Sequence, residues 1–225
     1  MPKKSGIVFI LTGTVLMLSA LSLFLYNRYE DAQAGQEAES LLADVQTVIK
    51  EKKPEKPTDA SAESEKTTPP ETLPPELPVA EIDGYGYVGY ISIPDLELEL
   101  PVMSEWDYTR LKIAPCRQFG SSRMDDLVIA AHNYENHFGN LSQLKAGDTV
   151  IFTDMDGFEN IYEVSCVDTL APTEVEAVQN SGHDLVLYTC TYGGKTRVTV
   201  FCDRPEEQLA PPLPDEADYA VHLRL

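Results

Sequence analysis

The sequence predicts an all-β, barrel-like domain that an N-terminal helix holds at a membrane. Three observations support this architecture. Residues 81–205 contain many short runs of β-branched and aromatic residues between turn signals, with few helical periods. Residues 6–26 form an uncharged, mostly apolar run. Residues 51–80 are rich in Pro, Glu, Lys, Thr and Ser, which is typical of a disordered linker.

The apolar run 6–26 is long enough to cross a hydrocarbon core of ~30 Å as one helix. Lys3 and Lys4 precede it, and basic residues on the short side of a span favour the cytoplasm for that side. We therefore expect a single-pass anchor, with residues 1–5 in the cytoplasm and the remainder of the chain outside the cell.

A cleaved signal peptide is the alternative to an anchor. Residues 32–34, Ala-Gln-Ala, have small side chains at offsets that suit a signal peptidase. The apolar run is, however, longer than the roughly 7 to 15 residues of an ordinary signal-peptide core, and charged residues separate it from that site. These features favour the uncleaved anchor.

Residues 27–50 predict an amphipathic helix. Apolar residues recur at helical spacing at Ala38, Leu41, Leu42, Val45, Val48 and Ile49. This stripe needs a partner, and packing against the domain and self-association are both open.

The linker 51–80 is expected to give the domain reach from the membrane, and the acidic, Pro-rich tail 206–225 is expected to be loosely ordered.

Within the domain, alternation of apolar and polar residues and turn chemistry predict the individual elements. Strands are expected at Tyr87–Ile93, Leu96–Leu100, Leu127–Ala131, Thr149–Thr153 and Phe158–Thr169, a short helix at Trp106–Ile113, and a helical turn at Phe138–Leu144. The Leu96–Leu100 strand alternates strictly and should have one wet face, whereas Leu127–Ala131 should be buried. The long connection 170–184 is expected to form a wall of a groove.

The stretch 185–204 predicts a β-hairpin. Two strand-like runs flank Gly193-Gly194, and paired glycines supply the positive φ angles that a tight two-residue turn requires. Counting outward from this turn pairs Cys190 with Arg197, with Cβ atoms roughly 5 Å apart on the same face. Because side chains alternate along a strand, the residues of the opposite face of the hairpin should lie on the core side: Leu185, Leu187, Val198, Val200 and Cys202.

This pairing makes Cys190 a candidate nucleophile. A permanent cation beside a cysteine favours the thiolate, which is the reactive form. The alternative is a small buried cysteine with a solvated strand arginine, as most free cysteines behave. Cys166 is in phase with Tyr162 and Val164, so it should be a small core residue like Cys202, whereas Cys116 is not placed and one disulfide remains open.

His132 is the best placed of the four histidines to move a proton. It ends the buried run Leu127–Ala131, so it should be firmly held with its tip exposed, although a structural histidine is the alternative. Asn133 follows it and is a candidate to orient the ring or contact substrate, with a plain turn residue as the alternative. Tyr188 shares the face of Cys190 and is the other candidate substrate-binding residue.

The net charge of −20 argues against a nucleic-acid-binding surface. Four acidic residues could in principle bind Ca²⁺, namely Asp125, Asp126, Glu174 and Glu176. In so acidic a chain a solvated surface is the simpler interpretation. We therefore predict no metal and no cofactor.

Three segments together resemble the sortases. They are Leu187-Tyr188-Thr189-Cys190 followed by Arg197, the upstream Ala131-His132-Asn133, and Tyr87-Val88-Gly89-Tyr90-Ile91-Ser92-Ile93-Pro94. The resemblance covers about residues 84–204. It implies a closed eight-stranded β-barrel with a groove that holds the three residues, and a location on the outer face of a Gram-positive cell. It leaves the sortase class open.

The resemblance also implies a reaction. Sortases cut a Leu-Pro-x-Thr-Gly-like sorting signal of a secreted protein and transfer the acyl fragment to an amine, usually on a peptidoglycan precursor or a pilin lysine. Carried over, Cys190 would form the thioacyl enzyme, His132 would protonate the departing amine and deprotonate the incoming one, and Arg197 would hold the substrate carbonyl or the oxyanion. A cysteine endopeptidase that uses water and a non-catalytic surface adhesion or scaffold barrel are the alternative functions.

Overall fold

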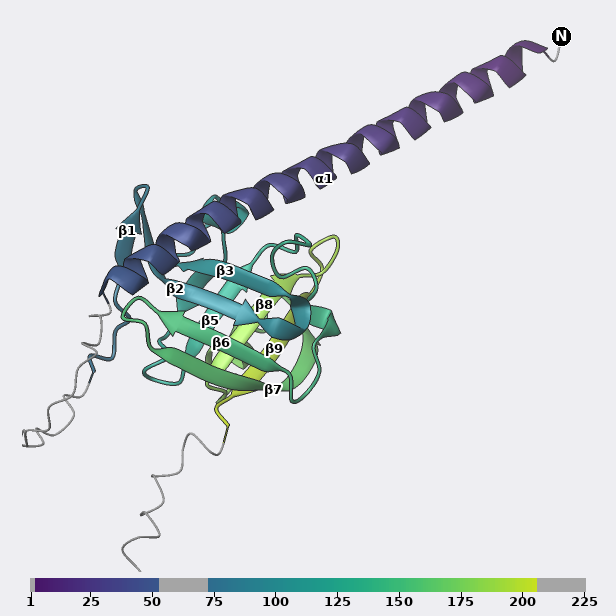
Figure 1. Cartoon of the computed structure of the whole chain (residues 1–225). Coiled ribbons are helices and arrows are strands. Elements are labelled where there is room, and N and C mark those ends of the chain that lie inside the picture. The colour runs from purple at the N-terminus through teal and green to yellow at the C-terminus, as the bar shows by residue number, and fades with distance from the viewer. Residues whose placement is uncertain (1–2, 53–72, 206–225) are drawn as a thin grey trace, which may run out of the picture.

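A computed structural model describes residues 3–52 and 73–205 of the chain. It consists of a barrel and a long helix, α1 (Lys3–Lys52), whose C-terminal half lies against the barrel while its N-terminal half projects away from it (Figure 1). The tail 206–225 and most of the predicted linker therefore lie outside the described residues. The division of the chain into anchor, helix, linker, domain and tail stays a prediction.

Eight strands close into the barrel, as the resemblance implied. They are β2 (Tyr85–Ile93), β3 (Leu98–Met103), β4 (Cys116–Phe119), β5 (Leu127–Ala131), β6 (Thr149–Asp154), β7 (Glu159–Leu170), β8 (Leu185–Cys190) and β9 (Arg197–Asp203). Their order is β2-β3-β4-β5-β8-β9-β7-β6, and pairing of β6 with β2 closes the sheet. A ninth strand, β1 (Ala80–Ile82), is added antiparallel to the start of β2. Full closure leaves the barrel itself without an unpaired edge.

The barrel interior is filled by the alternating residues that the sequence predicts. Leu185, Leu187, Val200 and Cys202 are buried in the main core, and Val198 packs against it. Burial of each large apolar side chain stabilises the fold by roughly 1.5–3 kcal/mol relative to exposure. The predicted orientation of the 185–204 hairpin is therefore confirmed.

The predicted alternation of Leu96–Leu100 is confirmed, because Glu97 and Glu99 are exposed while Leu100 is buried, although strand β3 begins only at Leu98. The rest of β3, from Leu100 to Met103, is buried throughout, and α1 contacts this strand. The expectation for Cys166 is wrong. Cys166 is exposed rather than buried, because a register shift between Val164 and Cys166 in the pairing of β7 with β9 reverses the alternation there.

The helical elements of the domain are shorter than predicted. The segment Trp106–Ile113 contains only the 3₁₀ helix η2 (Arg110–Lys112), and the segment Phe138–Leu144 contains only η3 (Leu141–Gln143). A further 3₁₀ helix, η1 (Pro94–Leu96), occupies the predicted Pro94-Asp95 turn. The connection 170–184 contains a short helix, α2 (Val175–Gln179).

Helix α1 packs against the domain, which answers the question that its apolar stripe left open. Val45 and Ile49 are buried in a cluster with Tyr87 and Met103. Closer to the N-terminus of α1, small residues permit a closer approach: a Cβ added at Gly35 would lie only 2.9 Å from Asn136. The predicted span and the predicted amphipathic helix are therefore parts of one continuous helix.

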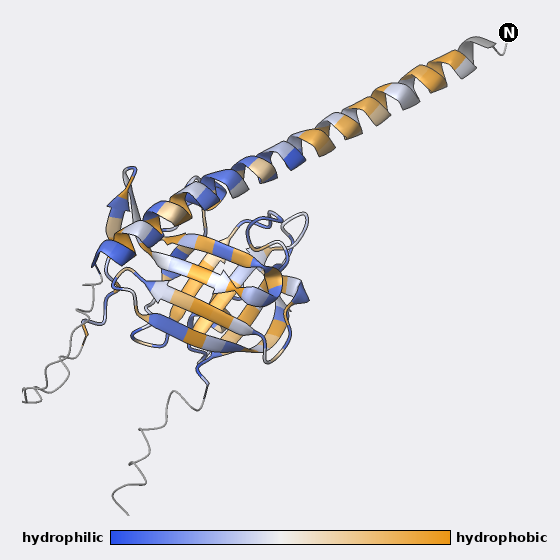
Figure 2. Cartoon of the chain, viewed as in Figure 1, coloured by the Kyte–Doolittle hydropathy of each residue, from blue (hydrophilic) through white to orange (hydrophobic). Residues whose placement is uncertain are grey.

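Figure 2 shows apolar residues around the N-terminal part of α1 and a mixed surface where the helix meets the barrel. Among the described residues, α1 is the one helix that is long and apolar enough to cross a membrane. The side chains of its apolar part are exposed, including Leu16, Leu21 and Phe24. Exposed apolar side chains all round a helix are typical of a segment that lies in lipid.

The segment that leads into β1 is also fixed to the barrel. Leu77 is buried in the main core. Arg123 donates hydrogen bonds to the carbonyl oxygens of Pro74 and Glu76 at 3.2 and 3.4 Å, and forms ion pairs with Asp154 and Asp156. The end of α1 and the segment around Leu77, which flank residues 53–72, therefore both contact the barrel.

Candidate active site

Three adjacent strands bring His132, Cys190 and Arg197 into one row at one end of the barrel. Strands β5 and β8 are parallel, with Ala131 beside Thr189, so the next residues, His132 and Cys190, continue the same register. Strands β8 and β9 are antiparallel, with Cys190 opposite Arg197. The predicted pairing of cysteine and arginine is therefore confirmed, and the histidine arrives beside them from a segment about 60 residues upstream.

The row projects from the outer face of the barrel. Ala131 and Thr189 are buried on the inner side, and the Thr189 hydroxyl donates a hydrogen bond to the Ala131 carbonyl oxygen at 2.9 Å. Since successive residues of a strand alternate in direction, Cys190 points outward. Cys190 is partly exposed, as a nucleophile must be.

The hairpin turn is wider than the predicted two-residue turn. Its closing hydrogen bond runs from the Thr191 amide to the Thr196 carbonyl oxygen at 2.9 Å, and the Gly194 amide bonds back to Thr191 at 2.8 Å. Gly193 and Gly194 have φ angles of +85° and +71°, so both use the left-handed region as expected. The loop therefore spans residues 192–195, and the register of Cys190 is unchanged.

Arg197 is held by its own hairpin. One guanidinium nitrogen, Nη1, donates to the carbonyl oxygens of Gly194 and Thr196 at 3.2 and 3.1 Å. Within the described part of the chain, its remaining N–H groups have no hydrogen-bond or ion-pair partner. A positioned guanidinium with free donors can bind a carbonyl oxygen or an oxyanion.

His132 is half-buried, and its ring stacks on Tyr134 with 4.9 Å between ring centroids. Burial lowers the pKa of His132, the nearby Lys112 lowers it further, and Glu30 of α1 opposes both. The imidazole is therefore neutral at pH 7 and can accept a proton. The sequence predicted the ring's position but gave no indication that a residue of α1 would influence its charge.

Tyr188 and Arg197 line a groove of about 160 Å³ on the outer face, which we call the donor groove. Its other walls include Trp106, Tyr108, Leu170 and Val178. The expected wall from the connection 170–184 is thus present. Burial raises the pKa of Tyr188 to about 12, so its phenol stays protonated and able to donate a hydrogen bond. Trp106 and Tyr108, which the sequence pattern placed on a short helix, also line this groove and were not predicted to do so.

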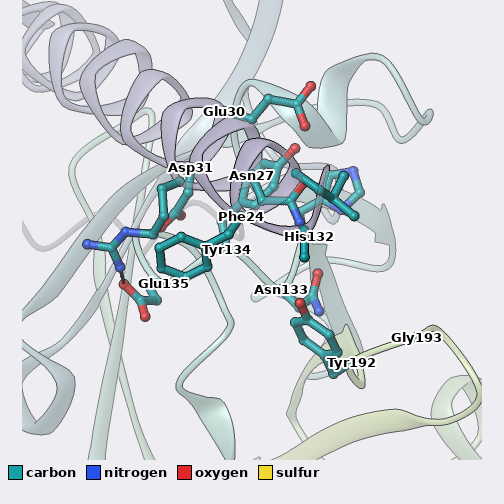
Figure 3. Close-up of a pocket in the computed structure, with 13 residues that line it drawn as sticks. Phe24, Asn27, Glu30, Asp31, His132, Asn133, Tyr134, Glu135, Tyr192 and Gly193 are labelled. Atoms are coloured by element: carbon teal, nitrogen blue, oxygen red, sulfur yellow. Dashed lines mark hydrogen bonds and ion pairs between the residues drawn. The ribbon is translucent and has the colours of Figure 1, made fainter. Parts of the chain in front are cut away.

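A second cavity, of about 600 Å³, lies on the other side of the row, between α1 and the barrel. We call it the helix–barrel pocket. Its lining includes Phe24, Glu30 and Asp31 of α1. Figure 3 shows this part of α1 above the loop that carries His132 and Asn133, with Tyr192 and Gly193 of the hairpin tip below that loop. Asn133 therefore lies in this pocket with His132, whereas Tyr188 lies in the donor groove.

The remaining cysteines are separate from the row. All four thiols are free. Burial raises the pKa of Cys116 to about 12 and raises that of Cys202 as well, so both are unreactive. Cys116, which the sequence left unplaced, donates a hydrogen bond to the Ala114 carbonyl oxygen at 3.4 Å.

Three of the four acidic residues considered for Ca²⁺ have other partners. Asp125 forms an ion pair with Arg204 at 2.7 Å, Asp126 accepts a hydrogen bond from the Ser121 amide, and Glu174 accepts one from the Ala171 amide. Over residues 3–52 and 73–205, no three His, Cys, Asp or Glu side chains are grouped so that they could hold a metal ion.

Comparison with known proteins identifies the family to which this fold belongs. A family model described as the Sortase domain matches residues 91–205, about half of the chain, including all three residues of the row. The chain belongs to the sortase family. Sortases are cysteine transpeptidases of the cell surface.

Individual sortases resemble this chain at 20 to 30% sequence identity. Sortase A of Bacillus anthracis is 30% identical over 121 residues, which cover 51% of this chain and 57% of that protein. The match therefore spans little more than half the length of this relative. Among solved structures, sortase A from Corynebacterium diphtheriae has a TM-score of 0.49 and 20% identity, over 60% of this chain and 65% of that one. Sortase C1 from Streptococcus agalactiae has a TM-score of 0.48 and 26% identity, over 56% and 70%.

Proposed function

We propose that this sortase is a membrane-anchored cysteine transpeptidase that cuts a Leu-Pro-x-Thr-Gly-like sorting signal and transfers the acyl fragment to an amine. The observation that best supports this is the register that aligns His132, Cys190 and Arg197 across β5, β8 and β9. A nucleophile, a neutral base and a fixed cation are the three groups that acyl transfer to a thiol requires.

In the first half-reaction, His132 takes the proton of the Cys190 thiol, and the thiolate attacks the carbonyl carbon of the scissile bond. Arg197 stabilises the oxyanion that forms. The C–N bond then breaks, and the His132 imidazolium gives its proton to the departing amine. The acyl fragment is left on Cys190 as a thioester.

In the second half-reaction, an amine attacks the thioester carbonyl and the C–S bond breaks. His132 takes a proton from the incoming amine and returns it to the Cys190 thiolate, so the enzyme regains its starting state. The donors in this proposal are secreted proteins with a C-terminal sorting signal. The acceptor amine belongs to a peptidoglycan precursor or a pilin lysine, and α1 anchors the extracellular barrel through residues 6–26.

The experiment compares Cys190→Ala with wild-type protein, full-length in lipid nanodiscs, on a fluorogenic sorting-signal peptide. Loss of the thiol should lower turnover by a factor on the order of 10³ or more, because no other group in the row can form the thioester. Cys166→Ala is the matched control, because Cys166 is exposed on β7 away from the row and its loss should leave turnover within about twofold.

The products separate the proposal from its alternatives. Cleavage that leaves only the free acid, even with triglycine present, would indicate an endopeptidase that uses water. Cys190 that forms no thioester and reacts with an alkylating reagent no faster than Cys166 would indicate a non-catalytic surface barrel. Normal turnover by Cys190→Ala would refute the nucleophile assignment.

A further inference from the structure

Two cavities flank the row, and they differ in character. The donor groove contains Arg197 and Tyr188, and the helix–barrel pocket contains His132. A transpeptidase must bind two molecules, an acyl donor whose carbonyl meets the cation and an amine that approaches the proton acceptor. The donor groove therefore provides the cation for the acyl donor, and the helix–barrel pocket provides the proton acceptor for the amine.

The charge of the helix–barrel pocket is negative. The charged side chains that line it are three carboxylates, Glu30, Asp31 and Glu135, and one guanidinium, Arg28. Arg28 is paired with Glu135 at 2.8 Å, and Asp31 is engaged with the Asn136 amide at 3.4 Å. Glu30 accepts one hydrogen bond, from the Tyr26 hydroxyl at 2.9 Å. Asp31 is buried, whereas Glu30 is partly exposed. Glu30 is therefore the carboxylate best able to take a cation, and a protonated amine complements this pocket.

The position of the pocket also restricts its occupant. Ala20, Leu23 and Phe24 form part of its wall, and they belong to the predicted span 6–26. Glu30 and Asp31 lie just beyond the end of that span. An amine in this pocket would thus meet lipid-facing side chains on one side and carboxylates on the other, at the surface of the bilayer.

We propose that the helix–barrel pocket is the acceptor subsite, where Glu30 of the anchor helix binds the ammonium group of the incoming amine beside His132. The proposal rests on the proposed transpeptidase function. The ammonium group releases one proton to water, the neutral amine attacks the thioester on Cys190, and His132 accepts the second proton as the C–S bond breaks. A segment outside the matched family region would then contribute a wall and a binding group to the site.

The test measures the two half-reactions separately on full-length protein in nanodiscs. Glu30→Gln should leave the rate of thioester formation from a sorting peptide within about twofold of wild type. It should raise the KM for triglycine, whose terminal amine is an ammonium at neutral pH, by about five- to tenfold. Glu30→Asp should recover part of the affinity. Glu37→Gln on the same helix, outside the pocket and hydrogen-bonded to Gln33, should change neither step.

A second acceptor distinguishes binding of the cation from an indirect effect on His132. Hydroxylamine is largely uncharged at neutral pH, so its KM should not change in Glu30→Gln. An equal loss with both acceptors would mean that Glu30 acts only through the imidazole, and an unchanged KM for triglycine would mean that the amine enters elsewhere. Either result overturns the acceptor subsite. Failure of the wild-type protein to form a thioester would instead overturn the proposed function.

Discussion

The guanidinium of Arg197 combines a fixed charge with a planar fork of donors. Two of its contacts are made to carbonyl oxygens of its own hairpin, so the group is oriented before substrate arrives. Arg197→Lys keeps the charge and loses the fork. We expect kcat/KM for a sorting peptide to fall by about a hundredfold, comparable to the loss of one oxyanion donor.

The matched control for this change is Lys195→Arg, at the exposed tip of the same hairpin. It should leave kcat/KM within about twofold, measured in the same peptide-cleavage assay. Full activity of Arg197→Lys would show that charge alone is sufficient and that the fork has no role.

The protonation of His132 is set by charges on two different elements. Burial and Lys112 lower its pKa, and Glu30 opposes them. Lys112→Met should therefore raise the pKa of His132 toward its ordinary value. Because the first half-reaction needs the neutral imidazole, the acidic limb of the pH profile for thioester formation should move to higher pH.

The measurement is the pH dependence of thioester formation by mass spectrometry, with Lys145→Met as a control at an exposed position away from the row. If the acidic limb of the Lys112→Met profile stays in place or moves to lower pH, the assignment of His132 as the base is contradicted. A lowered native pKa also means that protonation disfavours the folded state, so His132 contributes to stability above its unfolded pKa and this contribution is lost as the pH falls through the folded pKa.

At the scale of elements, the close contact of α1 with the loop after β5 positions the wall of the helix–barrel pocket. Gly35→Leu should separate α1 from this loop, because an added side chain would collide with Asn136. Leucine favours a helix more than glycine does, so α1 itself should remain intact. The overpacking should cost on the order of 1–3 kcal/mol of docking free energy.

Hydrogen exchange in nanodiscs checks this prediction. Amides of residues 133–139 should exchange faster in Gly35→Leu, and those of β8 and β9 should not change. Gly13→Leu is the control on the same helix, because a Cβ there meets no atom within 4 Å. Equal protection of the loop in both variants would show that α1 does not dock on it.

The elements also show what sequence can predict. The Leu127–Ala131 strand and the pairing of Cys190 with Arg197 were predicted correctly, because continuous apolar burial and a Gly-Gly turn are local signals. The exposure of Cys166 was missed because a β-bulge shifts the register without a distinctive residue. The burial of the second half of β3, beyond Leu100, was not predicted, because its cover comes from α1, about 60 residues away in sequence.

For the molecule as a whole, the closed barrel was expected from the family resemblance, and the wall that α1 adds to the site was not. An amphipathic stripe predicts that a helix has a partner, but it does not identify the partner or the face that is used. Cys190 and Arg197 could be named from sequence because the register of a hairpin is short-range information. His132 could be named because it ends a buried strand and matches the family resemblance. The helix–barrel pocket could not, because it depends on how two separately predicted segments meet.

With residues 6–26 in the bilayer, as we propose, the unbroken course of α1 from the apolar run to its docked half would hold the barrel close to the lipid, with the His132 end toward it. An enzyme held in this way searches for its substrates by lateral diffusion in a plane. Its turnover should then follow how densely donor and acceptor populate the membrane, and dilution of the surrounding medium should matter little. Such catalysis is effectively two-dimensional.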